Sequence, residues 1–152
     1  MIAVIQRVSR AKVTVAGRVA GSIEKGILVL ACALTGDTDA DAAALGTKIS
    51  EYRIFPDAAG KMNLSIADMN GSVLVVSQFT LAADGEKGRR PSFDRAASPD
   101  AGRALVDRLV EVLRTKGLSV ETGIFGADME VELVNEGPAT FVLERPRRGS
   151  FS

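Results

Sequence analysis

An unbroken run of eight apolar residues, Ile27 to Leu34, sets the first condition on the fold. The turn Glu24-Lys25-Gly26 comes directly before it. An apolar run of this length bounded by turns is typical of a strand that is buried on both faces. Other parts of the chain must then cover both sides of that strand. The 152 residues are enough to build such a core within a single domain.

Strand patterns lie on both sides of this run. Alternating segments rich in Val and Ile open the chain, and Ala16-Gly17-Arg18 predicts a hairpin between two of them. Asn70-Gly71 is a strong turn signal before another strand. Near the end, Asn135 to Pro138 has the composition of a turn between two strands. The predicted strands cover residues 2–8, 11–15, 19–23, 27–34, 53–55, 72–78, 130–134 and 139–144.

Two helices interrupt this series of strands. The first is predicted over Asp39 to Tyr52, with Asp39 as its cap. The second begins at the cap Ser98, has Pro99 in its first position and ends before Gly117. The sequence therefore predicts an α+β fold with a mostly antiparallel, barrel-like β-sheet and two main helices. We expect one domain over residues 1–146 and a loose basic tail over 147–152.

The chain contains no histidine, which removes several kinds of catalytic site. A Ser-His-Asp triad, a Cys-His dyad and a His-based zinc site are all excluded, and a single cysteine cannot build a Cys-rich metal site. We therefore expect no metal and no cofactor. Any proton transfer must use carboxylates, lysine, backbone groups or the substrate itself. The net charge of zero also argues against non-specific wrapping of nucleic acid by a basic surface.

The sequence favours a cytoplasmic location. Cys32 is the only cysteine, so no internal disulfide can form, which is usual in a reducing compartment. The longest apolar run is far shorter than the ~20 residues that span a bilayer. The first eight residues have the pattern of a strand and lack the features of a signal peptide. We expect a soluble protein that does not associate with membranes.

Three polar segments are candidates for a functional site. Ser77-Gln78-Phe79-Thr80-Leu81 stands where an apolar strand ends, and its side chains either satisfy backbone groups there or line a site. Asn135 to Thr140, taken alone, is an ordinary turn, because few X-Pro bonds are cis. Lys87 to Phe93 combines cations, glycine and an aromatic ring, which suits phosphate and base contacts but also a solvated loop.

Over roughly Met1 to Glu144, the chain resembles the D-aminoacyl-tRNA deacylase (D-tyrosyl-tRNA deacylase) family. Two segments match the family's signatures, Ser77 to Leu81 and Asn135 to Thr140. Glu136 and Ala139 depart from the Asp and Val that are more common in the second signature, but Gly137, Pro138 and Thr140 are kept. Further matches are Gln6-Arg7-Val8, Arg53-Ile54-Phe55, Gly60 to Ser65, Lys87 to Phe93 and Gly123 to Met129.

This resemblance implies a homodimer that hydrolyses the ester of D-aminoacyl-tRNA, with its active site at the subunit interface. The catalytic segment would be Ser77, Gln78, Phe79 and Thr80 of one subunit. Gly137 and Pro138, joined by a cis peptide bond, would enter from the other subunit and reject L-residues by a clash with backbone carbonyls. Thr140 and Arg7 would help to bind the substrate, and Lys87, Arg89 and Arg90 would contact the tRNA.

The mechanism that we expect needs no histidine. An aminoacyl ester is already activated, so the enzyme has mainly to place water and stabilise the oxyanion. The Phe79 N–H, aided by the Ser77 hydroxyl, is the expected donor to the oxyanion. Because the Gly137-Pro138 carbonyls would reject only a side chain, the site would also admit glycyl-tRNA, including glycine mischarged on tRNA-Ala. Two alternatives stay open. One is an esterase or amidase with Thr80 as nucleophile, and the other is a noncatalytic RNA-binding module.

Overall fold

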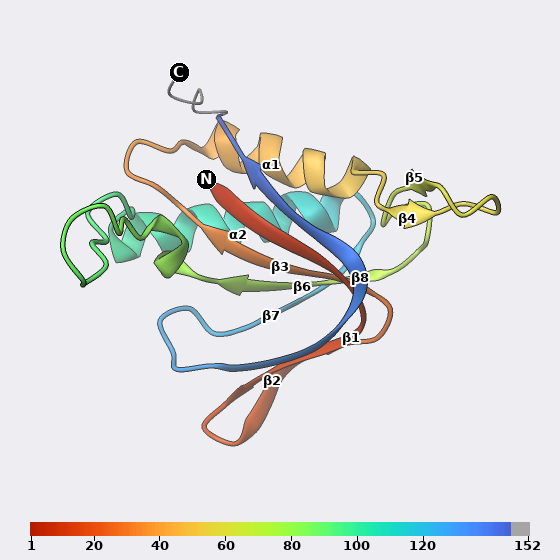
Figure 1. Cartoon of the computed structure of the whole chain (residues 1–152), viewed down its shortest axis with the longest axis horizontal. Coiled ribbons are helices and arrows are strands. Elements are labelled where there is room, and N and C mark those ends of the chain that lie inside the picture. The colour runs from red at the N-terminus through yellow and green to blue at the C-terminus, as the bar shows by residue number, and fades with distance from the viewer. Residues whose placement is uncertain (147–152) are drawn as a thin grey trace.

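The computed structural model describes residues 1–146, and the predicted basic tail, 147–152, lies outside this range. A six-stranded sheet has the order β2-β1-β3-β6-β7, and β8 pairs with β1. The predicted α+β class is confirmed (Figure 1). The strands are β1 (Ile2–Val15), β2 (Arg18–Ile23), β3 (Gly26–Cys32), β4 (Phe55–Pro56), β5 (Met62–Leu64), β6 (Ser72–Ser77), β7 (Ser119–Thr122) and β8 (Glu130–Glu144), and the helices are α1 (Asp39–Glu51), the 3-10 helix η1 (Phe79–Ala82) and α2 (Pro99–Thr115).

The sheet is mixed. Pairing is antiparallel between β1 and its partners β2, β3 and β8, and parallel between β3 and β6 and between β6 and β7. Parallel neighbours need a crossover connection, and α1 and α2 lie in these two connections. The two parallel pairs are therefore the ones whose strands are connected through a helix.

The apolar run folds as predicted, with β3 buried on both faces. Ile27, Val29 and Ala31 face a core that includes α1 and α2. Leu28 points to the other side, into a second core that Val8, Val13, Ile23 and Leu74 share with it. The first core lies between sheet and helices, and the second fills the curled sheet, so β3 separates the two.

The sheet curls until its two edges nearly meet, which accounts for the barrel-like form. β1 pairs with β3 along its first half and with β2 along its second half. A Cβ built on Gly21 of β2 would lie 2.7 Å from the carbonyl oxygen of Thr122 in β7. Only a glycine permits this approach of the two edge strands.

Gly26 offers a test of how tightly β3 and β6 approach. A Cβ at this position would lie 1.8 Å from the Ser72 carbonyl oxygen, a contact that requires the backbone to move. We expect Gly26→Ala to lower the free energy of unfolding by about 3 kcal/mol. Gly85→Ala is the matched control, because no atom lies within 4 Å of a Cβ there. Urea denaturation measures both, and equal stabilities would contradict the close approach.

The helix ends match the prediction for α2 and correct it for α1. Ser98 caps α2 and accepts a hydrogen bond from the Ala101 N–H at 3.4 Å. The cap of α1 is Thr38 and not Asp39: the Thr38 side chain accepts from the Asp41 N–H, and the Asp41 carboxylate accepts from the Thr38 N–H at 2.8 Å. This reciprocal pair satisfies two helix-end donors, which Asp39 alone would not do.

The end of the chain differs from the prediction. Residues 135–138 do not form a turn between two strands, because β8 continues from Glu130 to Glu144 without interruption. Asn135 pairs with Val8 and Thr140 pairs with Gln6, so four residues of β8 lie opposite the single residue Arg7 of β1. Extra residues on one strand make a bulge, which bends the strand without ending it. The short strands β5 and β7 were also missed.

Candidate active site

The first candidate segment lies at the end of β6, as predicted. Ser77 is the last residue of β6, and η1 begins two residues later. The Gln78 carbonyl accepts a hydrogen bond from the Leu81 N–H at 3.2 Å, so it points into the 3-10 turn. In a trans peptide the N–H is opposite the C=O. The N–H of Phe79, which belongs to the same peptide unit, therefore points out of the turn.

The side chains of this segment contact one another and the residues nearby. The Gln78 amide donates a hydrogen bond to the Thr80 hydroxyl. The Phe79 ring is 59% exposed and packs edge-to-face on Phe93, with 5.1 Å between the ring centroids. Cys32 lies below, with its thiol directed at the Phe79 carbonyl oxygen 3.6 Å away. Burial raises the pKa of the Cys32 thiol, so it is a core residue and not a thiolate nucleophile.

A cavity of about 580 Å³ opens beside this segment. Its walls come from β6, η1, the start of α2 and the loop after β7. Among the described residues, Asp128 is the one charged side chain in the lining, which makes the cavity largely apolar. Ser77, Gln78, Phe79 and Phe93 of this lining belong to segments that the sequence analysis named as candidates. It assigned no role to the remaining walls, although Gly123 to Met129 matched the family. These walls include Ala97, Pro99, Gly102, Phe125 and Met129.

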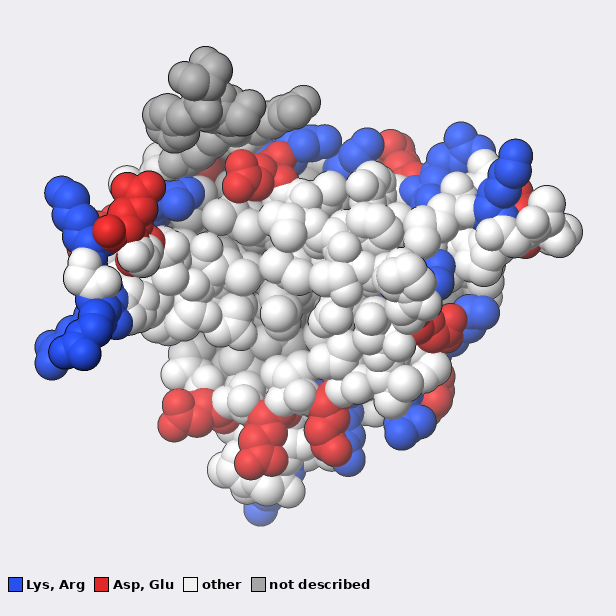
Figure 2. Space-filling model, in the orientation of Figure 1, with Lys and Arg blue, Asp and Glu red and all other residues white. Residues whose placement is uncertain are grey.

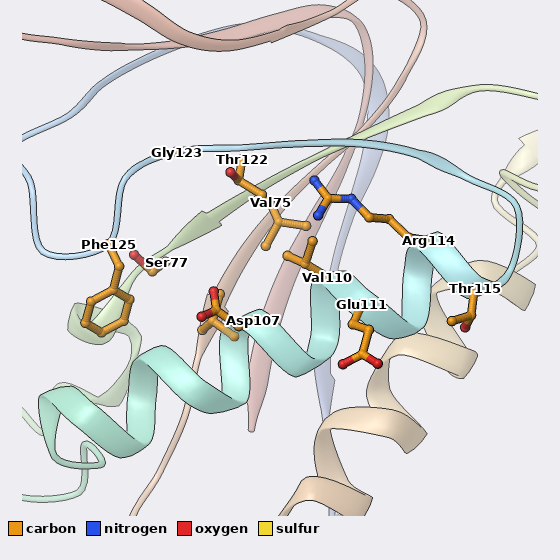
Figure 3. Close-up of a pocket in the computed structure, with 11 residues that line it drawn as sticks. Val75, Ser77, Asp107, Val110, Glu111, Arg114, Thr115, Thr122, Gly123 and Phe125 are labelled. Atoms are coloured by element: carbon orange, nitrogen blue, oxygen red, sulfur yellow. The ribbon is translucent and has the colours of Figure 1, made fainter.

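A second cavity, of about 490 Å³, lies behind the first, between α2 and the ends of β6 and β7 (Figure 3). Ser77, Val106 and Phe125 line both cavities. The Arg103 guanidinium lies over the Phe125 ring, 4.8 Å from the ring centroid. No sequence pattern indicated this second cavity.

The basic loop lies close to the mouth of the first cavity. Asp84 and Ser92 close its base with two backbone hydrogen bonds of 2.8 and 2.9 Å. Lys87, Arg89 and Arg90 are exposed between them. Figure 2 shows Lys and Arg side chains projecting at the left end of the molecule, where the loop lies in Figure 1. Phe93, which follows the loop, contacts Phe79 and so connects the loop to the candidate site.

Gly137 and Pro138 lie in the bulge of β8, and the peptide bond between them is cis, as predicted. The Thr140 hydroxyl accepts a hydrogen bond from the Gln6 amide at 3.2 Å. The Asn135 amide donates to the Arg7 carbonyl at 3.0 Å, which ties one end of the bulge to β1, and to the Ala139 carbonyl at 3.2 Å, which links the two ends of the bulge.

The Arg7 side chain lies between the bulge and the segment before β4. Its Nη1 donates to the Ile54 carbonyl at 2.7 Å, and its Nε lies 4.0 Å from the Glu136 carboxylate. The Nε is buried and has no hydrogen-bond partner among the described residues. Arg7 therefore connects the bulge to the segment that precedes β4.

The two candidate segments do not meet within one chain. Ser77 is in register with Ala31 and Ala3, whereas Arg7, opposite the bulge, is in register with Ile27 and Val73. This offset of four residues corresponds to about 13 Å along the strands. β8 and β6 are separated by β1 and β3, which adds about 14 Å across the sheet. Figure 1 shows η1 and the bend of β8 at different ends of the sheet.

Within residues 1–146, no three His, Cys, Asp or Glu side chains gather so that they could hold a metal ion. None of the helices in this part of the chain is both long and apolar enough to cross a membrane.

Known proteins match this chain over nearly its whole length. The D-aminoacyl-tRNA deacylase of Geobacter metallireducens is 57% identical over 147 residues, 97% of each chain. The enzyme of the same name from Thermotoga petrophila is 56% identical over 144 residues, 95% of this chain and 97% of the relative.

Solved structures share the fold. The c-Myc DNA unwinding element binding protein superposes with a TM-score of 0.89 and 38% identity, over 96% of this chain and 99% of that one. A probable eukaryotic D-amino acid tRNA deacylase, 18% identical, has a TM-score of 0.81 over 94% of this chain and 98% of the other, and supports the fold alone. The family model described as D-Tyr-tRNA(Tyr) deacylase matches residues 4–144, and the chain belongs to this family.

Proposed function

We propose that this protein is a D-aminoacyl-tRNA deacylase that releases a D-amino acid and free tRNA by ester hydrolysis. The observation that carries the proposal is the outward-pointing Phe79 N–H at the rim of a largely apolar cavity. The relatives named D-aminoacyl-tRNA deacylase, matched at up to 57% identity over nearly the whole chain, support the same activity. A proofreading role in translation also favours the cytoplasm as its location and residues 1–146 as one functional domain.

The chemistry that we propose uses backbone more than side chains. Water attacks the ester carbonyl, the Phe79 N–H and the Ser77 hydroxyl hold the developing oxyanion, and the ester bond to the ribose oxygen then breaks. The ribose oxygen leaves with a proton from the attacking water, and the neighbouring free ribose hydroxyl assists this transfer. Gln78 supports the loop through its hydrogen bond to Thr80. Neither a metal nor a cofactor is required.

Thr80 as a covalent nucleophile is the weaker alternative. A threonine nucleophile needs a base that removes its proton. In the described part of the chain, the hydrogen-bond partner of the Thr80 hydroxyl is the Gln78 amide, which donates and cannot accept through its nitrogen. This arrangement orients the hydroxyl without activating it.

We further propose that the working enzyme is a homodimer whose active site contains the η1 segment of one subunit and the β8 bulge of the other. The distance between the two within one chain supports this assignment. So does the surface: Figure 2 shows a broad face with few charges at its centre and most charged side chains around its rim. Val142 is 65% exposed and Val134 39% exposed. Interfaces are depleted of charge at their core in the same way.

In this arrangement, chirality is read by backbone. The carbonyls at Gly137 and Pro138 face the substrate's α-carbon, hold the amino group and the α-hydrogen of a D-residue, and leave its side chain in solvent. An L-residue would direct its side chain at these carbonyls. Thr140 and Arg7 contribute by fixing the bulge through Gln6 and Ile54. Outside the site, Lys87, Arg89 and Arg90 contact the phosphates of the acceptor end.

Glycyl-tRNA tests this account of selectivity. Glycine has no Cβ to clash, and the D side chain lies in solvent, where it gains less than the ~1–3 kcal/mol that a hydrophobic contact is worth in a closed pocket. We therefore expect glycine to be removed from tRNA-Ala at a rate within about tenfold of D-alanine. L-Alanine should stay attached. The measurement is release of labelled glycine, D-alanine and L-alanine from the same tRNA.

The three outcomes separate the possible explanations. If glycyl-tRNA survives as well as L-alanyl-tRNA, the site recognises a D side chain positively and steric rejection is wrong. If L-alanine is released as fast as D-alanine, the enzyme has no chiral filter. If nothing is released, the proposed activity itself fails.

A further inference from the structure

The second cavity offers a site that the ester hydrolysis does not use. α2 supplies one wall through two adjacent rows of side chains, and β6, β7 and the loop after β7 supply the others. Its volume of about 490 Å³ is typical of pockets that bind small molecules. Because Ser77 and Phe125 line both cavities, a molecule released at the first site has only a short distance to travel to the second.

A guanidinium group stands at one end of this cavity. Arg114 donates a hydrogen bond to the Val120 carbonyl at 3.1 Å, which fixes its side chain to β7. In Figure 3 the guanidinium extends along α2, over Val110 and toward Val75 and Thr122. A guanidinium has five N–H donors, and this bond to Val120 uses one of them. The remaining donors suit a carboxylate, which arginine binds in a forked geometry.

A carboxylate stands nearer the other end. Figure 3 shows Asp107 on the side of α2 that faces β6, with Phe125 and Ser77 beyond it. The other acidic residue of the lining, Glu111, points away from the strands and pairs with Arg108 at 3.2 Å. Asp107 is therefore the carboxylate that can meet a cation inside the cavity. Between Asp107 and Arg114 the floor is apolar and consists of Val75, Val106 and Val110.

This combination selects one chemical class. Phosphate would be repelled by Asp107, a wholly apolar ligand would make no use of the charges of Arg114 and Asp107, and a simple cation would face Arg114. A zwitterion with an ammonium, a carboxylate and a small apolar group satisfies all three features. We propose that the second cavity binds a free α-amino acid, with its carboxylate on Arg114, its ammonium on Asp107 and its side chain on the valines.

The inference rests on the proposed function for the origin of the ligand, because ester hydrolysis produces a free amino acid at the neighbouring site. The cavity then retains the product after the tRNA has left, and a high concentration of free amino acid occupies it. Its recognition of the ligand depends on two charges that do not take part in hydrolysis.

Isothermal titration with D-alanine tests the site. We expect saturable binding that weakens about tenfold or more in Asp107→Asn and in Arg114→Gln, because a hydrogen bond to a charged group contributes ~1.5–3 kcal/mol. Asp100→Asn in α2 and Lys116→Gln at its C-cap are matched controls, because both side chains are exposed, as Asp107 and Arg114 are, but lie outside the lining; both should bind like the wild type. N-Acetyl-D-alanine lacks the ammonium and D-alaninamide lacks the carboxylate, so both should bind at least tenfold more weakly.

Several results would overturn the inference: no saturable binding of D-alanine, equal binding of the three probes, or equal binding by all four variants. Circular dichroism melts show whether Arg114→Gln still folds, and Asp107→Asn tests the site independently of the bond to Val120. Hydrolysis of D-alanyl-tRNA is measured on the same samples. Hydrolysis without binding refutes the second site alone, whereas charge-dependent binding without hydrolysis refutes the proposed function alone.

Discussion

Replacing Phe79 with proline is expected to lower kcat for D-alanyl-tRNA by about 100- to 1000-fold, the usual effect of losing one oxyanion donor. The substitution removes the Phe79 N–H and requires little else to change. Phe79 is the first residue of η1, a position that accepts proline. Gln78 before it has φ −146° and ψ 80°, outside the helical region that a following proline disfavours. Single-turnover kinetics with saturating enzyme measure the chemical step directly.

Two further variants show whether the N–H itself is responsible. Phe79→Ala keeps the N–H and loses the ring that packs on Phe93, so it should weaken substrate binding more than it lowers kcat. Thr80→Ala keeps the N–H and should lose less than tenfold. If Thr80→Ala were the variant that lost several orders of magnitude, or if mass spectrometry found an acyl group on Thr80, the nucleophile alternative would replace direct attack by water.

Local patterns predicted most of the fold because their physical causes are local. The turn at Ala16 and Gly17, the cap at Ser98 and the buried strand that begins near Ile27 each follow from a few neighbouring residues. Thr38 was missed because Asp39 is an equally good cap by residue type, and the choice depends on the reciprocal bond with Asp41. β7 was missed because its four residues gain their stability from β6 and α2 and not from their own pattern.

The bulge in β8 shows where pattern reasoning failed. Asn135, Gly137 and Pro138 are turn residues, and the prediction of a turn used only that composition. In the structure, Arg7 and Gln6 of β1 hold both ends of the segment in the sheet, so the strand continues past it. These partners lie about 130 positions away in the sequence, with 128 between Arg7 and Asn135. The turn prediction took no account of them.

The candidate site was predicted only in part, because local signals reveal one of its walls and not the other. The first segment, Ser77 to Leu81, was found because a polar stretch at the end of an apolar strand is a local signal. The opposite wall, which includes Phe93, Gly102 and Phe125, comes from three separate parts of the chain that only the fold brings together. The offset between Ser77 and Arg7 also depends on the register of four strands.

That offset gives the dimer proposal its sharpest test, the complementation of two defective chains. Phe79→Pro damages the η1 segment, and Gly137→Val crowds the bulge, where even a Cβ would lie 3.2 Å from the Asn135 side-chain oxygen. Each homodimer is expected to be nearly inactive, since both of its sites carry the defect. In a heterodimer whose sites are shared between subunits, one site carries both defects and the other carries none. We therefore expect heterodimers, purified by two different affinity tags, to recover about half of the wild-type activity. If each site lay within a single chain, every site in the heterodimer would contain one defect, and mixing would restore nothing. Light scattering confirms that the tagged species is a dimer, and a heterodimer of wild type with Phe79→Pro, also expected at half activity, provides the reference.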